Sequence, residues 1–256
     1  MMIGVVIPFH SQREALSEAL RSVEGSLVVV VDDSPEGGLV IDGVKVLRTL
    51  GEQGFAAAAN MGLAHWEAQT VDHVLLLNDD AALRPGAMGA LRSAWTEQDG
   101  ALAPVVFEPD GPIYGIDVGR FGRVRLRSSP GAVGALSGAA MLVRSSERFD
   151  SGFVHGFEDI ELCARLRSKG LRVRVVSGAE CDHAAGATIS RKSRIAQRRA
   201  MAGHLRWVGG GVSGALAIGM GLAQIVRERG PADRILGVLE GVRDHFIGPA
   251  DSSLQA

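Results

Sequence analysis

Short apolar runs alternate along the chain with longer stretches in which apolar residues recur every three or four positions. Apolar runs rich in Val and Ile are typical of strands buried on both faces, and the amphipathic stretches are typical of helices that cover a sheet. The predicted strands are 3–9, 27–31, 44–47, 71–77 and 101–107, and the predicted helices are 13–23, 54–66 and 87–96. This alternation predicts an α/β fold with a Rossmann-like, mostly parallel, doubly wound sheet.

The pattern changes after residue 107. Residues 108–130 are rich in Gly, Pro and Arg and predict a hairpin or a loop insertion. The elements predicted next are a strand-like run at 133–143, a helix that starts at Glu158, and a strand at 171–176. The rest of the chain has helical periodicity. We therefore expect an α/β domain over 1–190 and a basic, largely helical extension over 191–256.

Charge is unevenly distributed along the chain. Hydrophobic residues make up 46% of it and the formal net charge is −2, which argues against a nucleic-acid partner. From Ser190 to the end, ten Lys and Arg stand against five Asp and Glu, a local charge of +5. The basic cluster at 190–199 either contacts a phosphate, on a donor or on a lipid, or forms a solvated helix face.

The sequence also bears on where the protein works. The first residues have neither the basic flank nor the long apolar segment of a signal peptide, so we predict a cytoplasmic protein. Cys163 and Cys181 lack metal-binding spacing and are predicted to be reduced thiols in the core. The uncharged run 208–226 is long enough to span a bilayer but contains six glycines. We expect an interfacial or packed helix there, with peripheral contact to the inner face of the membrane.

Two predicted strands end in pairs of aspartates, Asp32-Asp33 and Asp79-Asp80. Ligands of open α/β sheets bind beyond the carboxyl ends of the strands, where both pairs should lie. The first pair either accepts a hydrogen bond from a uracil or thymine ring or caps a turn. The oxygens of Asn78-Asp79-Asp80 would suit Mg²⁺ or Mn²⁺ bridging a diphosphate. His183 is either a further metal ligand or a packing residue.

A second acidic feature lies at the start of the helix predicted from Glu158. Glu158 and Asp159 occupy its exposed first turn, where one of them could act as a catalytic base. Acidic residues are also ordinary caps at helix starts, because they complement the helix dipole. Gly138, within a strand pattern, indicates either close approach of a sugar to the backbone or a bulge. The first βα turn, 8–12, has no glycine, which argues against a nicotinamide-dependent dehydrogenase.

Several motifs in a fixed order resemble those of glycosyltransferase family two, in particular its rhamnosyltransferase-like branch. They are Pro8 in the first strand, Val-Asp-Asp-Ser at 31–34, Gly-Phe-Ala-Ala-Ala-Ala-Asn-Met-Gly at 54–62, Leu-Leu-Leu-Asn-Asp-Asp at 75–80, Ser-Gly-Ala-Ala-Met at 137–141, and the 149–170 block. The resemblance covers about residues 3–190. It implies a GT-A fold and an inverting transfer from a UDP-, dTDP- or GDP-linked sugar. The implied acceptor is a glycan, a small molecule or a polyprenyl-linked compound.

The resemblance also implies roles for individual residues. Asp159 would be the general base with Glu158 as its neighbour, and Asp80 and His183 would hold Mn²⁺ or Mg²⁺. The residues expected to contact the donor are Pro8, Asp32, Asp33, Asn60, Asn78, Asp79 and Gly138. Residues 1–190 would then be the domain that binds the nucleotide sugar and carries out the transfer.

Two other functions remain open at this stage, and so does the formation of a homodimer. A sugar-1-phosphate nucleotidyltransferase also uses an α/β sheet and a divalent ion, but those enzymes carry an early Gly-rich, basic loop that is missing here. A non-catalytic carbohydrate-binding protein with the same fold is the other alternative. A homodimer is compatible with the sequence.

Overall fold

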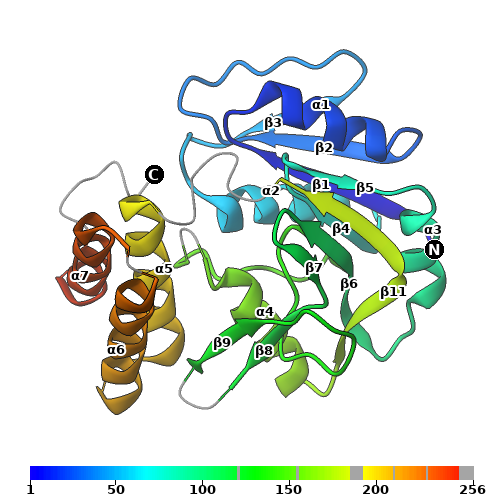
Figure 1. Cartoon of the computed structure of the whole chain (residues 1–256). Coiled ribbons are helices and arrows are strands. Elements are labelled where there is room, and N and C mark those ends of the chain that lie inside the picture. The colour runs from blue at the N-terminus through cyan, green and yellow to red at the C-terminus, as the bar shows by residue number, and fades with distance from the viewer. Residues whose placement is uncertain (120–121, 154–155, 185–192, 210, 229, 248–256) are drawn as a thin grey trace.

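The computed structural model describes residues 1–119, 122–153, 156–184, 193–209, 211–228 and 230–247 (Figure 1). A curled sheet lies at the centre, with helices on both faces and a group of helices beside it. The strands are β1 (Ile3–Phe9), β2 (Leu27–Asp32), β3 (Lys45–Arg48), β4 (His73–Leu77), β5 (Ala81–Leu83), β6 (Asp99–Glu108), β7 (Gly111–Ile113), β8 (Ile116–Val118), β9 (Val124–Leu126), β10 (Ala140–Arg144) and β11 (Arg172–His183). The helices are α1 (Arg13–Ser22), α2 (Phe55–Ala68), α3 (Ala87–Ala94), α4 (Glu158–Ser168), α5 (Arg194–Val208), α6 (Gly211–Arg227) and α7 (Ala232–Ile247).

The main sheet has the strand order β3-β2-β1-β4-β10-β6-β11-β5, and β7 pairs with β6. Strands β1, β2, β3, β4, β6 and β11 run in one direction. Strands β10, β5 and β7 run in the other. The expected α/β fold with a mostly parallel, doubly wound sheet is therefore confirmed, with an antiparallel strand inserted near its middle.

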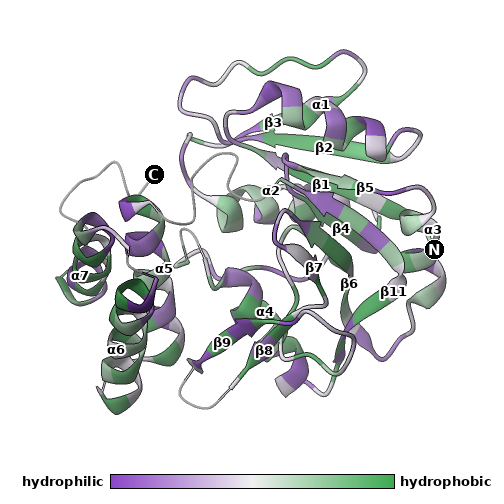
Figure 2. Cartoon of the chain, viewed as in Figure 1, coloured by the Kyte–Doolittle hydropathy of each residue, from purple (hydrophilic) through white to green (hydrophobic). Residues whose placement is uncertain are grey.

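Two apolar clusters sandwich this sheet, one on each face. Helices α1 and α3 pack on the face that receives Val5 and Ile7 of β1. Helices α2 and α4 pack on the opposite face, which receives Val6. Strands β2, β4 and β6 are accordingly apolar along most of their length in Figure 2. Cys163 and Cys181 are buried free thiols, as predicted.

Contact between α2 and β1 is unusually close because two glycines remove side chains from it. A Cβ on Gly62 would lie 2.3 Å from Cγ1 of Val6, and one on Gly4 would lie 2.7 Å from the ring of Trp66. The indole Nε1 of Trp66 donates to the Val5 carbonyl at 3.0 Å. Helix α2 is thereby held directly over the strand whose carboxyl end reaches the acidic edge.

The structure differs from the predicted elements in three places. Strand β5 was not predicted, and it pairs with the far end of β11. The strand-like run at 133–143 forms a strand only at Ala140–Arg144. Strand β11 continues past residue 176 to His183 after a register shift. Within 108–130, β8 and β9 form the predicted hairpin, of which residues 120–121 lie outside the described part.

The C-terminal helices form a unit with an apolar core of its own. Met201, Leu205, Ala217, Ile225 and Val238 make up that core. Figure 1 shows the three helices beside the sheet, with α5 nearest to it. The expected helical extension is present, although the division at 190/191 falls outside the described residues. No helix in the described ranges is long and apolar enough to cross a bilayer.

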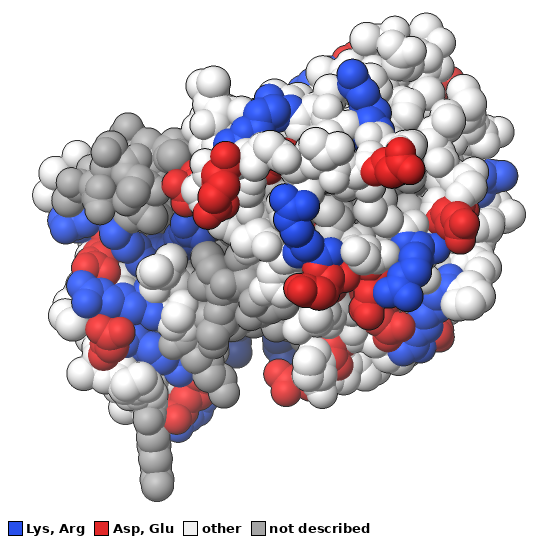
Figure 3. All heavy atoms as spheres, turned by 90° about the horizontal axis from the view of Figure 1, so that it is seen from above, with Lys and Arg blue, Asp and Glu red and all other residues white. Residues whose placement is uncertain are grey.

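Ion pairs neutralise part of the basic cluster predicted at 190–199. Arg194 pairs with Glu240, and Arg198 with Asp244, both across to α7. Residues 190–192 lie outside the described part of the chain. Seen from above, acidic and basic side chains are interspersed over the molecule (Figure 3). The arginines at 194 and 198 therefore hold α5 against α7.

Candidate active site

The acidic turn after β4 begins the candidate site. The Asn78 amide donates to the Ala139 carbonyl at 2.9 Å, which joins this turn to the start of β10. The buried Asp79 accepts from the His10 amide at 3.1 Å and so holds the turn between β1 and α1. Burial raises the pKa of Asp79 to about 6 despite that hydrogen bond, and the adjacent charge of Asp80 adds to the rise. Asp79 therefore supports the site from behind.

Asp80 reaches across to the end of β11, where it meets His183. The Nε2 atom of His183 lies 3.1 Å from Oδ1 of Asp80, and its Nδ1 lies 3.0 Å from Oε1 of Glu108. The three side chains are only 9%, 9% and 4% exposed. Burial alone would lower the pKa of His183, but hydrogen bonds to the two carboxylates outweigh it and raise the pKa to about 9. The imidazole is thus protonated at neutral pH.

This arrangement fits a divalent ion. A metal-binding His usually gives its second ring nitrogen to a carboxylate, as His183 gives Nδ1 to Glu108. Two ligands at right angles on an ion with bonds of about 2.1 Å lie roughly 3 Å apart, close to the separation of Asp80 and His183. Mg²⁺ and its relatives often take one or two protein ligands and complete their shell with phosphates and water. The described residues contain no ready group of three or more His, Cys, Asp or Glu side chains around one point.

The second acidic feature lies at the start of α4. Asp159 accepts from the Gly138 amide at 3.0 Å and from the Ile160 amide at 2.8 Å. Burial raises the pKa of Asp159 despite these hydrogen bonds. Burial and the charge of Asp159 raise the pKa of Glu158 to about 8. With a pKa of about 8, Glu158 holds a proton at neutral pH, and the pair as a whole binds protons more tightly than two exposed carboxylates do.

Two hydrogen bonds, one of them to the Asp159 side chain, link the acidic features to each other. Asp159 is bonded to Gly138, and the next residue, Ala139, is bonded to Asn78. Asn78 directly follows β4, so both carboxylate groups lie at the carboxyl end of that strand. The structure thus brings Asp80 and Asp159 to one edge of the sheet, where the sequence pattern placed ligands.

Asp32 and Asp33, at the end of β2, hold two loops. Asp32 accepts from Ser34 and Leu39 amides at 3.0 and 3.1 Å and from Arg48 at 3.1 Å. Burial opposes ionisation of Asp32, but these hydrogen bonds and the charge of Arg48 prevail and lower its pKa. Asp33 accepts from the Gln53 and Gly54 amides at 2.9 and 2.8 Å. Of the two roles left open, the turn role is visible in these contacts, and donor binding stays a prediction.

Pro8 and Asn60 also have structural surroundings. Pro8 lies in β1 in register with Val31 of β2. The Asn60 side chain donates to the Phe149 carbonyl at 2.9 Å and accepts from the Phe149 amide at 2.8 Å. It therefore fixes the start of the segment that leads to α4. A donor contact for either residue, and for Gly138, stays a prediction.

No sequence pattern singles out Glu108, and Phe157 was quoted only as part of the 149–170 block. Glu108, which orients His183, ends β6 and is far from it in the sequence. Phe157, just before Glu158, has a φ of +73°, which is strained for an aromatic residue. Its ring stacks on His204 of α5, with ring centroids 4.7 Å apart and planes 12° from parallel. The Gly156-Phe157 step before the acidic pair was the available signal for this strained turn.

Named proteins resemble this chain over most of its length, although no family model matches it. A pre-mycofactocin glycosyltransferase of Mycobacterium tuberculosis is 31% identical over 194 residues, a match that covers 67% of this chain and 40% of that protein. The N-acetylglucosaminyl-diphospho-decaprenol L-rhamnosyltransferase of the same organism is 30% identical over 225 residues, covering 70% of this chain and 73% of that protein. The chain belongs to glycosyltransferase family two. The second relative is consistent with the rhamnosyltransferase-like branch of the family.

A solved structure agrees with the family-two assignment at the level of the fold. A crystal structure of GalNAc-T7 with UDP, GalNAc and Mn²⁺ superposes with a TM-score of 0.64 and 15% sequence identity. The match covers 81% of this chain and 47% of that one. At this identity the likeness shows the fold alone, which is the GT-A fold expected of family two. The chain spans only 40% of the length of the pre-mycofactocin glycosyltransferase.

Proposed function

We propose that this protein moves a sugar from a nucleoside-diphosphate donor to an acceptor hydroxyl in a single displacement with inversion. The observation that carries the proposal is the placement of Asp80, His183 and Asp159 at one edge of the sheet. Asp80 and His183 would hold Mn²⁺ or Mg²⁺, which neutralises charge on the departing diphosphate. The GalNAc-T7 structure, which has this fold, contains UDP and Mn²⁺. The candidate donors for the present protein are UDP-, dTDP- and GDP-linked sugars.

Asp159 supplies the proton acceptor. Its carboxylate takes the proton of the acceptor hydroxyl, and the freed oxygen forms a bond to the anomeric carbon. The bond from that carbon to the diphosphate breaks, and the nucleoside diphosphate leaves with the electron pair. Glu158 keeps its own proton and so adds no second charge beside the base. The raised pKa of Asp159 makes it a stronger base than an exposed aspartate.

Partners and location follow from the same proposal. A relative named for a decaprenol-linked substrate favours a polyprenyl-linked acceptor over a free glycan or small molecule. Such a substrate would bring the protein to the inner face of the membrane from the cytoplasm. No dimer is needed to complete the acidic edge, and a homodimer stays a prediction.

The decisive test replaces Asp159 with Asn. We expect D159N to lower transfer by at least about 10³-fold, because a positioned base contributes roughly 10²–10⁴, while donor binding is unchanged. Glu161→Gln is the matched control, since it changes an acid of the same helical turn that pairs with Arg165 instead. Transfer by D159N at the wild-type rate would refute the assignment. Release of pyrophosphate from a nucleoside triphosphate would point to a nucleotidyltransferase.

A further inference from the structure

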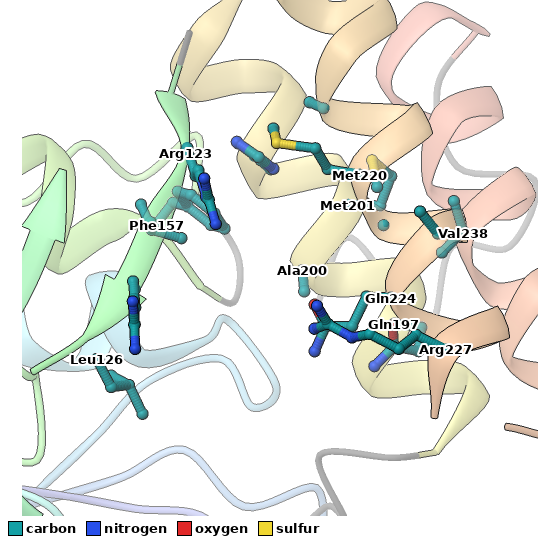
Figure 4. Close-up of a pocket in the computed structure, with 16 residues that line it drawn as sticks. Arg123, Leu126, Phe157, Gln197, Ala200, Met201, Met220, Gln224, Arg227 and Val238 are labelled. Carbon is teal, nitrogen blue, oxygen red and sulfur yellow. The ribbon is translucent and has the colours of Figure 1, made fainter. Parts of the chain in front are cut away.

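A cavity of about 970 Å³ lies beside the acidic edge, between the β8–β9 hairpin and the C-terminal helices. Figure 4 shows Arg123, Leu126 and Phe157 on one side of it, facing side chains of α5, α6 and α7 on the other. This volume is within the range of small-molecule sites, about 300–1,000 Å³. The acidic residues proposed for metal binding and catalysis do not line it.

The walls of the cavity are apolar where they are deepest. Met201, Ala217, Met220 and Val238 line it from the three helices. Met201, Ala217 and Val238 belong to the buried core of that unit. Methionine side chains adapt to flexible hydrocarbon because they are unbranched and polarizable. This part of the cavity therefore suits an aliphatic chain.

The rim of the cavity is cationic. Arg123 just before β9, Arg125 within β9 and Arg227 of α6 are exposed and line it. Among the described residues, none of the three has a carboxylate partner, and no Asp or Glu lines the cavity. Three uncompensated guanidinium groups attract an anion, and Arg is well suited to phosphate because it donates two parallel hydrogen bonds. The rim thus favours a phosphate group over a neutral or cationic one.

Phe157 connects this cavity to the proposed base. Its ring forms part of the cavity wall and is stacked on His204, whose Nε2 lies 2.7 Å from the Gly122 carbonyl. The next two residues are Glu158 and Asp159. The cavity therefore extends to the residue that directly precedes α4.

We infer that this cavity receives the prenyl-phosphate part of an acceptor whose hydroxyl belongs to a sugar linked through that phosphate, with the hydrocarbon chain on the methionine-lined wall and the phosphate on Arg123, Arg125 and Arg227. The inference rests on the proposed transferase function, because the bound compound is an acceptor only if the protein transfers a sugar to it. It goes beyond that function because it assigns the chemical class of the acceptor to a site. Its binding part can be measured without any donor or metal.

The test is calorimetric titration of the full chain with farnesyl diphosphate, inorganic diphosphate and farnesol. We expect farnesyl diphosphate to bind at least about tenfold more tightly than either fragment, because each fragment engages only one half of the cavity. The R123Q/R227Q variant should lose about tenfold or more in affinity for farnesyl diphosphate, since it removes charge-assisted hydrogen bonds. Ala223→Trp fills space at an exposed lining position. It should lower the affinity for farnesyl diphosphate but leave the affinity for inorganic diphosphate unchanged.

Matched controls are Arg92→Gln on α3 and Ala64→Trp on α2, both exposed and outside the cavity lining. They should change affinity by less than about twofold. Equal binding of inorganic diphosphate would reduce the site to an anion site and overturn the inference. Equal binding of farnesol, binding that survives both cavity variants, or no binding would also overturn it. Binding to phosphatidylglycerol vesicles that survives Ala223→Trp would assign the arginines to a membrane surface instead.

Failure of the inference can be told apart from failure of the proposed function. If farnesyl diphosphate does not bind but D159N still abolishes transfer to a water-soluble acceptor, only the cavity assignment fails. If farnesyl diphosphate binds as expected but no nucleoside-diphosphate sugar is consumed with Mn²⁺ or Mg²⁺ present, the transferase proposal fails and the binding site stands.

Discussion

The surroundings of Glu158 disfavour its ionised form. Its Oε2 atom is buried and has no hydrogen-bond partner among the described residues. Together with the neighbouring charge of Asp159, burial raises its pKa to about 8 from an ordinary value of 4.5. The folded protein therefore binds this proton more tightly than the unfolded chain does. The contribution of Glu158 to the free energy of unfolding therefore falls as pH rises from about 5 to 8.

Replacing Glu158 with Gln should remove this cost. We expect E158Q to unfold with a free energy about 1–3 kcal/mol higher than wild type at pH 8, and with an equal one at pH 4, where both side chains are neutral. Urea unfolding across that pH range measures the difference. Glu161→Gln should give no gain at pH 8, because Glu161 pairs with Arg165. A constant difference between E158Q and wild type from pH 4 to 8 would contradict the raised pKa.

His183 should couple metal binding to pH. With a pKa of about 9 it carries a proton that has to leave before Nε2 can bind a metal ion. The apparent affinity for Mn²⁺ should therefore increase about tenfold per pH unit between pH 7 and 9 and then level off. Calorimetry in buffers of different ionisation enthalpy reports the released proton. Glu108→Gln lowers the pKa of His183, so the plateau should begin at lower pH. Affinity for Mn²⁺ that is independent of pH would show that His183 is not a ligand.

Sequence reasoning located Asp80, His183 and Asp159 because strand ends and helix starts are visible in the hydrophobic pattern. It left open what Asp33 does, and it did not identify the partner of Asn60. Asp33 holds the Gln53-Gly54 turn, and Asn60 holds the backbone of Phe149. Such contacts join residues far apart in the sequence, and a carboxylate or amide that holds a loop has the same local pattern as one that holds a ligand.

Among the elements, α2 can pack against β1 only because Gly62 carries no side chain where the two meet. We expect Gly62→Ala to lower the free energy of unfolding by about 1–3 kcal/mol, because the new methyl group would overlap the rigid, buried Val6. Gly89→Ala on α3 is the opposite case, since its Cβ would meet nothing within 4 Å. It should raise stability by about 0.5–1 kcal/mol, the usual gain from Ala in a helix. Urea unfolding of both variants tests the pair, and a stable Gly62→Ala would show that α2 can move off β1.

The strands and helices that were predicted correctly are those with long local patterns. Strand β4 has five buried residues in a row, and α1 has a clear amphipathic stripe. Strand β5 has only three residues, too few for any periodicity, and exists because it pairs with β11. The extension of β11 passes through Ser177-Gly178, where propensity favours a stop, and it continues because β5 and β6 flank it on both sides.

The whole molecule consists of an α/β body and a helical unit, each with its own apolar core. Few specific contacts join them. His204 stacks on Phe157 and reaches the Gly122 carbonyl, and Arg206 pairs with Asp150 at 3.0 Å. These contacts all fall on segments that precede α4 or form the hairpin. The helical unit is therefore placed to brace the start of α4 from outside the sheet.

His204→Ala should uncouple the two parts. Loss of the stack removes the contact that holds the strained Phe157, and loss of the Nε2 contact frees the hairpin at Gly122. Because each part keeps its own core, we expect calorimetry of H204A to show an additional unfolding transition below the main one. Transfer should fall while donor binding is retained, because the hydrogen bonds described for the acidic turn after β4 join it to His10 and Ala139.

The matched control is His245→Ala, which removes the same side chain near the end of α7, where its ring meets the adjacent Phe246 edge-on. It should leave the unfolding curve in the wild-type form and the transfer rate unchanged. If H204A unfolds in the same single transition as H245A and transfers sugar at the same rate, the stack does not brace the base. The fixed orientation of Phe157 would then have to come from its own segment, through Gly156 and the first turn of α4.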